Sequence, residues 1–327
     1  KELLKSINEL GFNNPTPIQS KVIPHLMSSD QDLIASAQTG TGKTAAFGLP
    51  LLDLTNTKVT NVQTLILCPT RELCIQITND LLTYSKYLKN INILSVYGGV
   101  KIEKQIKSLK KGPQIVVGTP GRTNDLIRRK KLIIGNIDRL ILDEADEMLS
   151  MGFKEDLEAI IQQTPKKKQI LLFSATMTQK VVGVTKKYMK NSLEIAVARV
   201  NRAADNVEHI FYVVKPRDRY EVVKRIADMN PDIYGIVFCR TRRETKDIAI
   251  KLMNDHYNAD TIHGDLSQSE RDDVMRRFRN GQLQILVATD VAARGLDVED
   301  LTHIINYNLP DDDEVYIHRS GRTGRAG

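Results

Sequence analysis

The sequence has few of the features that mark disulfide-rich, metal-binding or membrane proteins. Its three cysteines, Cys68, Cys74 and Cys239, are an odd number without a CxxC pair, which disfavours a disulfide framework and a zinc site and leaves them as packed core residues. No apolar run reaches about 18 residues, so no membrane span is predicted. The start, KELLKSINEL, lacks the charged, apolar and small-residue sections of a signal peptide. We therefore expect a cytoplasmic globular protein.

Positive charge exceeds negative charge. The formal net charge is +7 and the isoelectric point is near 9.1. Lys and Arg side chains that neutralise phosphates release counterions, so this balance favours a polyanionic partner. The basic runs at 107–111, 128–131 and 166–168 are more often solvated helix ends or loops, because cations favour helix C-termini. These runs alone predict no binding site.

Short apolar runs alternate with amphipathic stretches along most of the 327 residues, and no short-period repeat is visible. This alternation predicts parallel sheets covered by helices, in two α/β domains of similar layout. The predicted strands lie at 32–37, 64–70, 91–99, 113–120, 139–146, 168–176, 193–197, 235–241, 259–265, 283–290 and 302–310. The pattern lapses at 198–207, so we expect a first domain at 1–197, a linker at 198–207 and a second domain at 208–327.

A glycine-rich segment, AQTGTGKT at 37–44, lies between the predicted strand DLIAS and the predicted helix TAAFGLPLL. This context is typical of a phosphate-binding loop, because backbone N–H groups and a helix N-terminus converge on the anion. Gly40 and Gly42 permit the tight turn, Lys43 would reach the β and γ phosphates, and the Thr44 hydroxyl would ligate magnesium. Ala37 stands where the usual pattern has its first glycine, so the loop has to accommodate a methyl group.

The segment DEAD, residues 143–146, directly follows the apolar strand RLIL. Ligands of open parallel sheets bind beyond the carboxyl ends of the strands. Asp143 suits a magnesium contact, and Glu144 suits orienting and deprotonating the attacking water. The alternative is an acidic cluster that caps a helix, and the phosphate-binding loop of the same sheet favours the site.

A third polar segment, GFNNPTPIQ at 11–19, precedes the glycine-rich loop. Its prolines fix an extended turn, and the amide of Gln19 both donates and accepts hydrogen bonds, as an adenine edge requires.

Taken in order with those that follow, these motifs resemble the DEAD-box family of ATP-dependent RNA helicases, of bacterial type, in helicase superfamily two. The match covers essentially the whole chain. In the first domain it continues with PTREL (69–73), Gly98 and Gly99, TPGR (119–122) and SAT (174–176). In the second it runs through VFCRTRR (237–243), HGDLSQSERD (263–272), ATDVAARGLD (288–297) and HRSGRTGR (318–325). The resemblance implies two tandem RecA-like domains, ATP and Mg²⁺ as cofactors, and RNA as the partner.

The resemblance also implies residue roles. The residues implied to bind ATP are Phe12, Gln19, Thr39, Gly40, Thr41, Gly42, Lys43, Thr44, Asp143, Glu144, Gly264, Asp290, Arg322 and Arg325, with Thr44 and Asp143 at the metal. The backbone of single-stranded RNA would be held by Pro69, Thr70, Arg71, Gly98, Gly99, Thr119, Pro120, Gly121, Arg122, Arg240, Gln268, Arg271, Thr289, Arg294 and Gly295. Asp146, Ser174, Thr176, His318 and Arg319 would couple hydrolysis to domain movement.

The sequence departs from the family pattern at both ends. The family has an aromatic residue upstream of GFNNPTPIQ that stacks on adenine, and the sequence starts after that position. It stops just past the last motif, at Gly327. We therefore expect a helicase core trimmed at both ends.

The final stretch, HRSGRTGRAG at 318–327, is either a frayed basic tail or half of a catalytic site. The resemblance favours the site, with Lys43, Glu144, Arg322 and Arg325 as catalytic residues and the two arginines as fingers on the γ phosphate. His318 and Arg319 would bond to the acidic and SAT motifs of the first domain.

Two alternatives to the helicase function remain open. An ATP-gated RNA clamp with little turnover uses the same residues, and a DNA translocase has the same two-domain plan.

Overall fold

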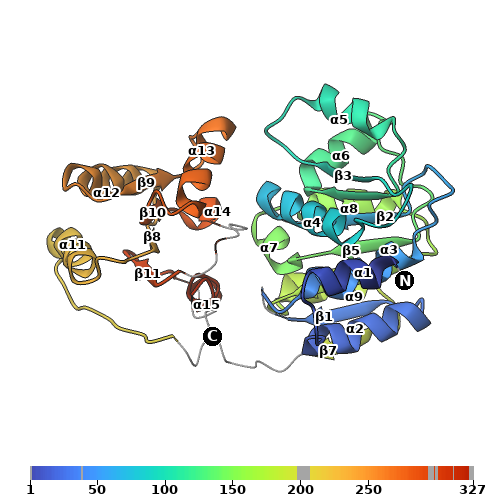
Figure 1. Ribbon diagram of the computed structural model, residues 1–327, viewed down its shortest axis with the longest axis horizontal. Coiled ribbons are helices and arrows are strands. Elements are labelled where there is room, and N and C mark those ends of the chain that lie inside the picture. Colours follow the sequence, from blue (N-terminus) through green and yellow to red (C-terminus); the bar gives the residue numbers. More distant parts are fainter. Residues whose placement is uncertain are drawn as a thin grey trace. The chain divides into compact units, whose positions relative to one another are not determined.

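The computed structural model describes residues 2–37, 40–196, 207–293, 298, 301–311 and 313–323, without the side chains of Val291, Glu314 and His318. The chain divides into two compact units, Lys1–Arg199 and Val200–Gly327, here the first and the second unit. Each unit contains a parallel sheet with helices on both faces (Figure 1). The predicted linker lies outside the described residues except for residue 207.

Seven parallel strands form the sheet of the first unit, in the order β3-β4-β2-β5-β6-β1-β7. Each coincides with a predicted apolar run, so the strand predictions for this unit are confirmed. The strands are β1 (Leu33–Ser36), β2 (Thr64–Leu67), β3 (Ile93–Val96), β4 (Ile115–Gly118), β5 (Arg139–Leu142), β6 (Gln169–Ser174) and β7 (Leu193–Ala196).

Two apolar clusters fill the first unit, one on each face of its sheet. Successive side chains of a strand point to opposite faces, so Ile66 joins one cluster while Leu65 and Leu67 join the other. The first cluster is covered by α2 (Pro17–Ser28), α3 (Lys43–Leu54) and α4 (Arg71–Tyr84), with α1 (Glu2–Glu9) outside α4. The second is covered by α5 (Ile102–Leu109), α6 (Pro120–Arg128), α7 (Ala145–Ser150), α8 (Lys154–Gln163) and α9 (Gln179–Tyr188).

The second unit repeats this layout with a smaller parallel sheet, in the order β11-β8-β10-β9. Its strands, β8 (Gly235–Phe238), β9 (Ala259–Ile262), β10 (Ile285–Ala288) and β11 (His303–Asn306), also match predicted runs. Its helices are η1 (Pro216–Asp218), α11 (Arg219–Met229), α12 (Arg242–Asn254), α13 (Gln268–Arg279), α14 (Asp290–Ala293) and α15 (Asp313–Ser320). α11 and α12 pack against one face, and α13 and α14 pack against the other.

The polar motifs follow the carboxyl ends of the strands. In the first unit, β1, β2, β3, β4, β5 and β6 lead into the glycine-rich loop, PTREL, the Gly98-Gly99 pair, TPGR, DEAD and SAT. Because all strands are parallel, these six segments lie along one edge of one sheet. Threonines at these connections also begin the helices. The side chain of Thr70, for example, accepts a hydrogen bond from Leu73 N at 3.2 Å and caps α4.

Candidate functional site

The glycine-rich loop is tied to the segment that precedes α2. The Gln19 side chain donates from Nε2 to the carbonyl of Gly42 at 3.2 Å and accepts from Thr16 N at 2.9 Å. The Thr16 hydroxyl donates to the carbonyl of Thr41 at 2.9 Å. These bonds use one N–H and one lone pair of the Gln19 amide, so donor and acceptor capacity remains for an adenine edge. Gln19 therefore braces the loop, a role that the sequence did not predict.

The loop backbone requires glycine at two positions. Gly40 has a φ of 83° and Gly42 a φ of 85°, in the left-handed region that residues with a Cβ rarely adopt. A Cβ on Gly42 would lie 2.5 Å from Nε2 of Gln19. The predicted tight turn is present, and α3 begins directly after Gly42. Thr39 lies outside the described residues.

Lys43 and Asp143 face each other in the interior at the edge of the sheet. Their Nζ and Oδ1 atoms are 3.7 Å apart, and both side chains are buried. Among the described residues, the Lys43 ammonium has no hydrogen-bond partner. Burial raises the pKa of Asp143, Lys43 opposes this rise, and the nearby Asp146 adds to it. A buried ammonium and a buried carboxylate beside a glycine cradle fit a metal-bound triphosphate.

Glu144 has an uncommon backbone conformation. Its φ of 51° puts it in the left-handed region, which a residue with a Cβ adopts at a cost in energy. Its N–H donates to Oδ1 of Asp143 at 3.1 Å, and α7 begins at the next residue. This turn separates Glu144 from the regular helix and places it, with little exposure, beside Asp143.

Asp146 connects the DEAD segment to the SAT segment. Its Oδ2 atom accepts hydrogen bonds from the backbone N–H of Ala175 and Thr176, at 3.1 and 2.8 Å, and from the Thr176 hydroxyl at 2.9 Å. The Ser174 hydroxyl donates to the carbonyl of Thr176 at 2.7 Å. The structure thus brings together the three residues predicted to couple hydrolysis to movement in the first unit.

The arginines of PTREL and TPGR lie near the loop after β3. The Arg71 guanidinium is 4.9 Å from the centre of the Tyr97 ring, a cation–π distance. Arg122 donates to Oε1 of Gln105 at 3.0 Å and to the carbonyl of Val100 at 3.1 Å.

Gln105 is the centre of this group. It is buried on α5, and its Nε2 atom donates to the carbonyl of Tyr97 at 3.0 Å. Sequence reasoning missed Gln105, although a glutamine among the apolar residues of an amphipathic helix was a usable signal. The other candidates of these motifs, Pro69, Thr70, Gly98, Gly99, Thr119, Pro120 and Gly121, lie at the same edge of the sheet.

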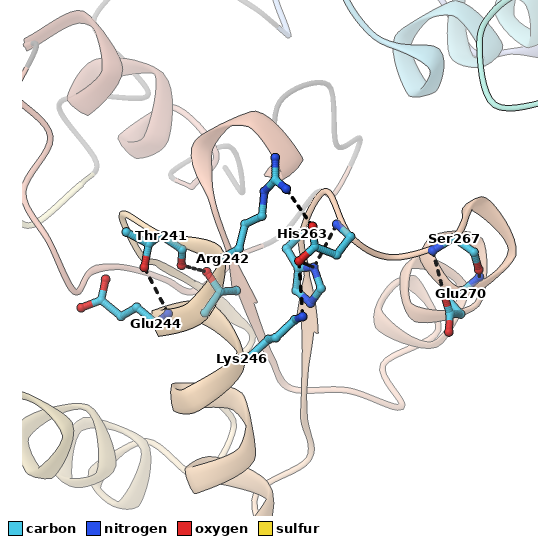
Figure 2. Close-up of polar contacts among 9 residues, drawn as sticks. Thr241, Arg242, Glu244, Lys246, His263, Ser267 and Glu270 are labelled. Carbon is cyan, nitrogen blue, oxygen red and sulfur yellow. Dashed lines mark hydrogen bonds and ion pairs between the residues drawn. The ribbon is translucent and has the colours of Figure 1, made fainter.

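In the second unit, Asp265 follows β9 and bonds to two side chains of α12. It accepts from Arg242 at 2.7 Å and from Lys246 at 3.3 Å (Figure 2). Nδ1 of the buried His263 accepts from the N–H of Asp265 at 3.2 Å, and burial is the main cause of the lowered pKa of His263. The Arg242 guanidinium lies 3.5 Å from where a Cβ of Gly264 would be. Arg242 and Asp265 were not predicted.

The predicted RNA-contact residues of the second unit are partly engaged within that unit. Arg240 donates to Asp311 at 2.7 Å. Gln268 bonds within α13, to Asp272. Arg271 donates to the carbonyl of Ala292 at 2.6 Å. The carbonyl of Thr289 caps α14 by accepting from the N–H groups of Ala292 and Ala293. Arg294 and Gly295 lie outside the described residues.

Arg319 is tied into the second unit, which the sequence did not predict. Its buried guanidinium forms two hydrogen bonds with the carboxylate of Asp290, at 2.6 and 2.7 Å. It also donates to Oδ1 of Asn306 at 2.7 Å and to the carbonyl of Asn308 at 2.9 Å, and it lies 4.7 Å from the centre of the Phe238 ring. These contacts use most of the N–H groups of the guanidinium inside the second unit, and the bond to the first unit stays a prediction. Asp290, expected to face the ribose, is its ion-pair partner.

The remaining residues of HRSGRTGRAG are only partly described. Arg322 follows α15, and its N–H donates to the carbonyl of Arg319 at 3.1 Å. Thr323 pairs with Leu301 in a parallel bridge. Arg325 and the side chain of His318 lie outside the described residues. The alternative of a frayed tail is therefore wrong for the residues up to Thr323, which belong to α15 or pair with Leu301.

Within the described residues, no helix is long and apolar enough to cross a membrane, and no group of three or more metal-ligating side chains occurs. The three cysteines are buried and free, as predicted.

Comparisons with known proteins agree with the motifs. Residues 16–184 match the family model described as DEAD/DEAH box helicase, and residues 218–327 match that of the helicase conserved C-terminal domain. The chain is 47% identical over 327 residues to the ATP-dependent RNA helicase CshA of Listeria monocytogenes. It covers 62% of that relative's length.

Two solved structures are similar over the whole chain. One is Dbp5 of S. cerevisiae bound to RNA and ADP BeF3, at 33% identity, a TM-score of 0.87 and coverage of 100% of this chain and 84% of that one. The other is Mss116p bound to ssRNA and AMP-PNP, at 31% identity, a TM-score of 0.85 and coverage of 100% and 70%. The two sheets are thus those of two tandem RecA-like α/β domains, as predicted. By its motifs, its fold and its relatives, the chain belongs to the DEAD-box helicase family.

Proposed function

We propose that the chain is the core of an ATP-dependent RNA helicase that couples ATP hydrolysis to local RNA duplex unwinding or RNP remodelling. The observation that carries this proposal is the buried Lys43–Asp143 pair, which lies next to Glu144 and a glycine cradle. The full-length relative is named an ATP-dependent RNA helicase, and Dbp5 was solved with RNA and ADP BeF3. We take the first domain as 1–197, the linker as 198–207 and the second domain as 208–327.

The first unit would bind the nucleotide. Gly40, Thr41 and Gly42 cradle the phosphates with backbone N–H groups, and Lys43 neutralises the β and γ phosphates. Phe12, an exposed aromatic residue, and Gln19 would contact adenine.

Mg²⁺ would be held by the hydroxyl of Thr44 and the carboxylate of Asp143. When bound, it supplies a positive charge that offsets the charge of the phosphate oxygens. The observation that fits a cation there is Asp143 itself, a buried carboxylate whose pKa is raised by burial and whose ionised form a cation stabilises.

Glu144 would orient the attacking water and accept its proton. The left-handed turn holds the backbone N–H of Glu144 on Asp143, whereas Asp146 bonds to the SAT segment. The two acids would therefore have different roles. Glu144 acts on the water, and Asp146 transmits the state of the nucleotide to Thr176 and the SAT segment.

The second unit would complete the catalytic site. We propose Arg322 and Arg325 as arginine fingers that stabilise charge on the γ phosphate in the transition state. Gly264 would line the nucleotide site from the same unit. Asp290 would face the ribose while it holds Arg319, at 2.6 Å. Closure of the two domains on ATP and single-stranded RNA would then switch hydrolysis on.

RNA would be held by its phosphates and 2′-hydroxyls, with little sequence preference. On the first unit the contacts would come from the PTREL, Gly98-Gly99 and TPGR residues, and on the second from Arg240, Gln268, Arg271, Thr289, Arg294 and Gly295. Bending one strand while its partner is expelled would separate a short duplex locally. The cytoplasmic location stays a prediction.

Release of a labelled strand from a short duplex tests this function. We expect ATP-dependent release from an RNA duplex, little release from the same sequence in DNA, and none from RNA with Glu144→Gln. ATP-dependent RNA binding without release would indicate a clamp. Equal activity on DNA would indicate a translocase.

A further inference from the structure

Five lysines are exposed on α5 and on the residues directly before and after it: Lys101, Lys104, Lys107, Lys110 and Lys111. Here they are called the α5 lysine surface. Within the described part of the chain, none of them forms an ion pair. In the second unit, by contrast, Arg240, Arg242 and Lys246 are each paired with a carboxylate. The α5 lysine surface therefore carries five positive charges, against the one negative charge of the exposed Glu103 on the same helix.

Helix geometry gathers part of this charge on one face. Lys104 and Lys107 are three residues apart on α5, so they lie on the same side of the helix, and Lys110 and Lys111 follow in the turn after it. Ile102, Ile106 and Leu109 point the other way and pack against the core cluster of the sheet. The helix itself, Ile102–Leu109, is roughly 12 Å long, at 1.5 Å per residue.

The surface starts next to the proposed RNA-contact residues and is fixed to them. Lys101 follows the Gly98-Gly99 pair by two residues. The buried Gln105 bonds to the carbonyl of Tyr97 and to Arg122, at 3.0 Å each, and Arg122 also bonds to the carbonyl of Val100. α5 also lies beside β3, the edge strand of the first sheet (Figure 1). The lysines thus lead away from the motif edge of the sheet along the side of the first unit.

We propose that the α5 lysine surface binds the phosphates of RNA that extends beyond the Gly98-Gly99 and TPGR motifs. This inference rests on the proposed function, because it assumes that those motifs hold RNA. Lysines act on phosphates as point charges without sequence preference, which suits a path that continues backbone contacts. An acidic protein would also be attracted, but the direct continuity with Arg122 and the Gly98-Gly99 loop favours the nucleic acid.

The test compares two charge-matched double variants of the full chain. Lys104→Gln with Lys107→Gln removes the two lysines within α5 from the surface, and glutamine has nearly the same helix propensity as lysine. Lys166→Gln with Lys167→Gln removes two exposed lysines just before β6, at the opposite edge of the sheet. The probes are the shortest oligouridylate that stimulates ATP hydrolysis and the same RNA extended at either end by about ten nucleotides, enough to pass along the roughly 12 Å of the helix.

We expect the extension at one end to raise the affinity of the wild type and of the Lys166/Lys167 control. The Lys104/Lys107 variant should lose most of that gain and bind the shortest RNA like the wild type. Each lost phosphate contact makes the salt slope shallower by about 0.7, so the wild-type advantage should shrink roughly sevenfold between about 50 and 200 mM salt.

Equal binding of the extended RNA by the Lys104/Lys107 variant and the wild type would overturn the proposal, as would an equal loss on the shortest RNA. Polyglutamate, a mimic of an acidic protein, is a further probe. If the Lys104/Lys107 variant loses only polyglutamate binding, the surface binds an acidic protein and the proposal is overturned. If the wild type neither binds nor responds to any RNA, the proposed function itself fails, and the proposal fails with it.

Discussion

Asp146 and Thr176 join two loops that are 30 residues apart in the sequence. One carboxylate oxygen of Asp146 accepts both the N–H and the hydroxyl of Thr176, at 2.8 and 2.9 Å. Hydrogen bonds to an ionised acceptor are stronger than those between neutral groups. We therefore expect a change in the position of the DEAD segment to move the SAT segment.

Thr176→Ala should lower both stability and coupling. It removes the hydroxyl bond to a charged acceptor, so the free energy of unfolding of the first unit should fall by about 1.5 to 3 kcal/mol in denaturant titrations. RNA-stimulated ATP hydrolysis should fall, while ATP affinity changes little. Thr176→Ser keeps the hydroxyl and should retain most of both. Identical behaviour of the two variants would show that this bond has no role.

Gln105→Leu should weaken RNA binding without weakening ATP binding. The change leaves the carbonyl of Tyr97 and a donor of Arg122 without their partner, so Arg122 is no longer held in place. We expect RNA affinity to fall about tenfold, equivalent to about 1.4 kcal/mol. Fluorescence anisotropy with labelled RNA and with labelled ATP measures the two effects. Gln105→Glu keeps the acceptor for Arg122 and should be intermediate. Equal losses for both ligands would mean general damage to the first unit.

Arg319→Met should destabilise the second unit. The side chain is 4% exposed, and its removal leaves Asp290, whose side chain is 30% exposed, without its ion-pair partner. Breaking such a pair costs about 3 kcal/mol, visible as a lower denaturant midpoint. Arg240→Met is the control, because the Arg240–Asp311 pair is mostly exposed and contributes little. Equal midpoints for the two variants would contradict the structural role of Arg319.

The second unit should lose stability as the pH falls below about 6.5. Burial, more than the neighbouring Lys246, lowers the pKa of His263 below its ordinary value of 6.5, so the unfolded chain binds a proton more readily than the folded one. The stability that comes from keeping His263 neutral is therefore present above that pH, and it is lost as the pH falls through the pKa of the folded state. Burial also lowers the pKa of His303, which shares the effect.

His263→Gln should reduce this acid sensitivity, because glutamine does not titrate and can still accept from the N–H of Asp265. Denaturant midpoints at about pH 7.5 and 5.5 measure the difference. His256→Gln, at an exposed position, is the control and should leave the difference unchanged. The account of His263 fails if both variants keep the full acid sensitivity.

The sequence predicted the strands and the edge of the sheet at which the motifs gather, for a physical reason. A strand buried on both faces has to be a continuous apolar run, and parallel strands bring their carboxyl ends to one edge. Lys43, Asp143 and Glu144 each directly follow such a run or its loop, so their proximity followed from the pattern. The left-handed turn at Glu144 did not, because its residue type gives no sign of a positive φ.

The contacts that fix the motifs against one another could not be predicted in the same way. Gln105 and Asp265 act through partners 17 and 23 residues away, and hydrophobic periodicity carries no information on such pairs. The motif of Arg319 predicted a bond to the first unit, but it gave no sign of the burial against Phe238 and the pairing with Asp290 inside the second unit.

The central claim is that RNA switches on ATP hydrolysis at a site completed by the second unit. Steady-state ATP hydrolysis by the full chain, with and without single-stranded RNA, tests it most directly. We predict strong stimulation in the wild type and none with Glu144→Gln. Arg325→Ala should lose about 10³-fold or more of the stimulated rate, at least about 4 kcal/mol of barrier, with ATP affinity nearly unchanged. Hydrolysis that does not respond to RNA, or an Arg325→Ala variant that loses ATP binding as much as turnover, would contradict the account.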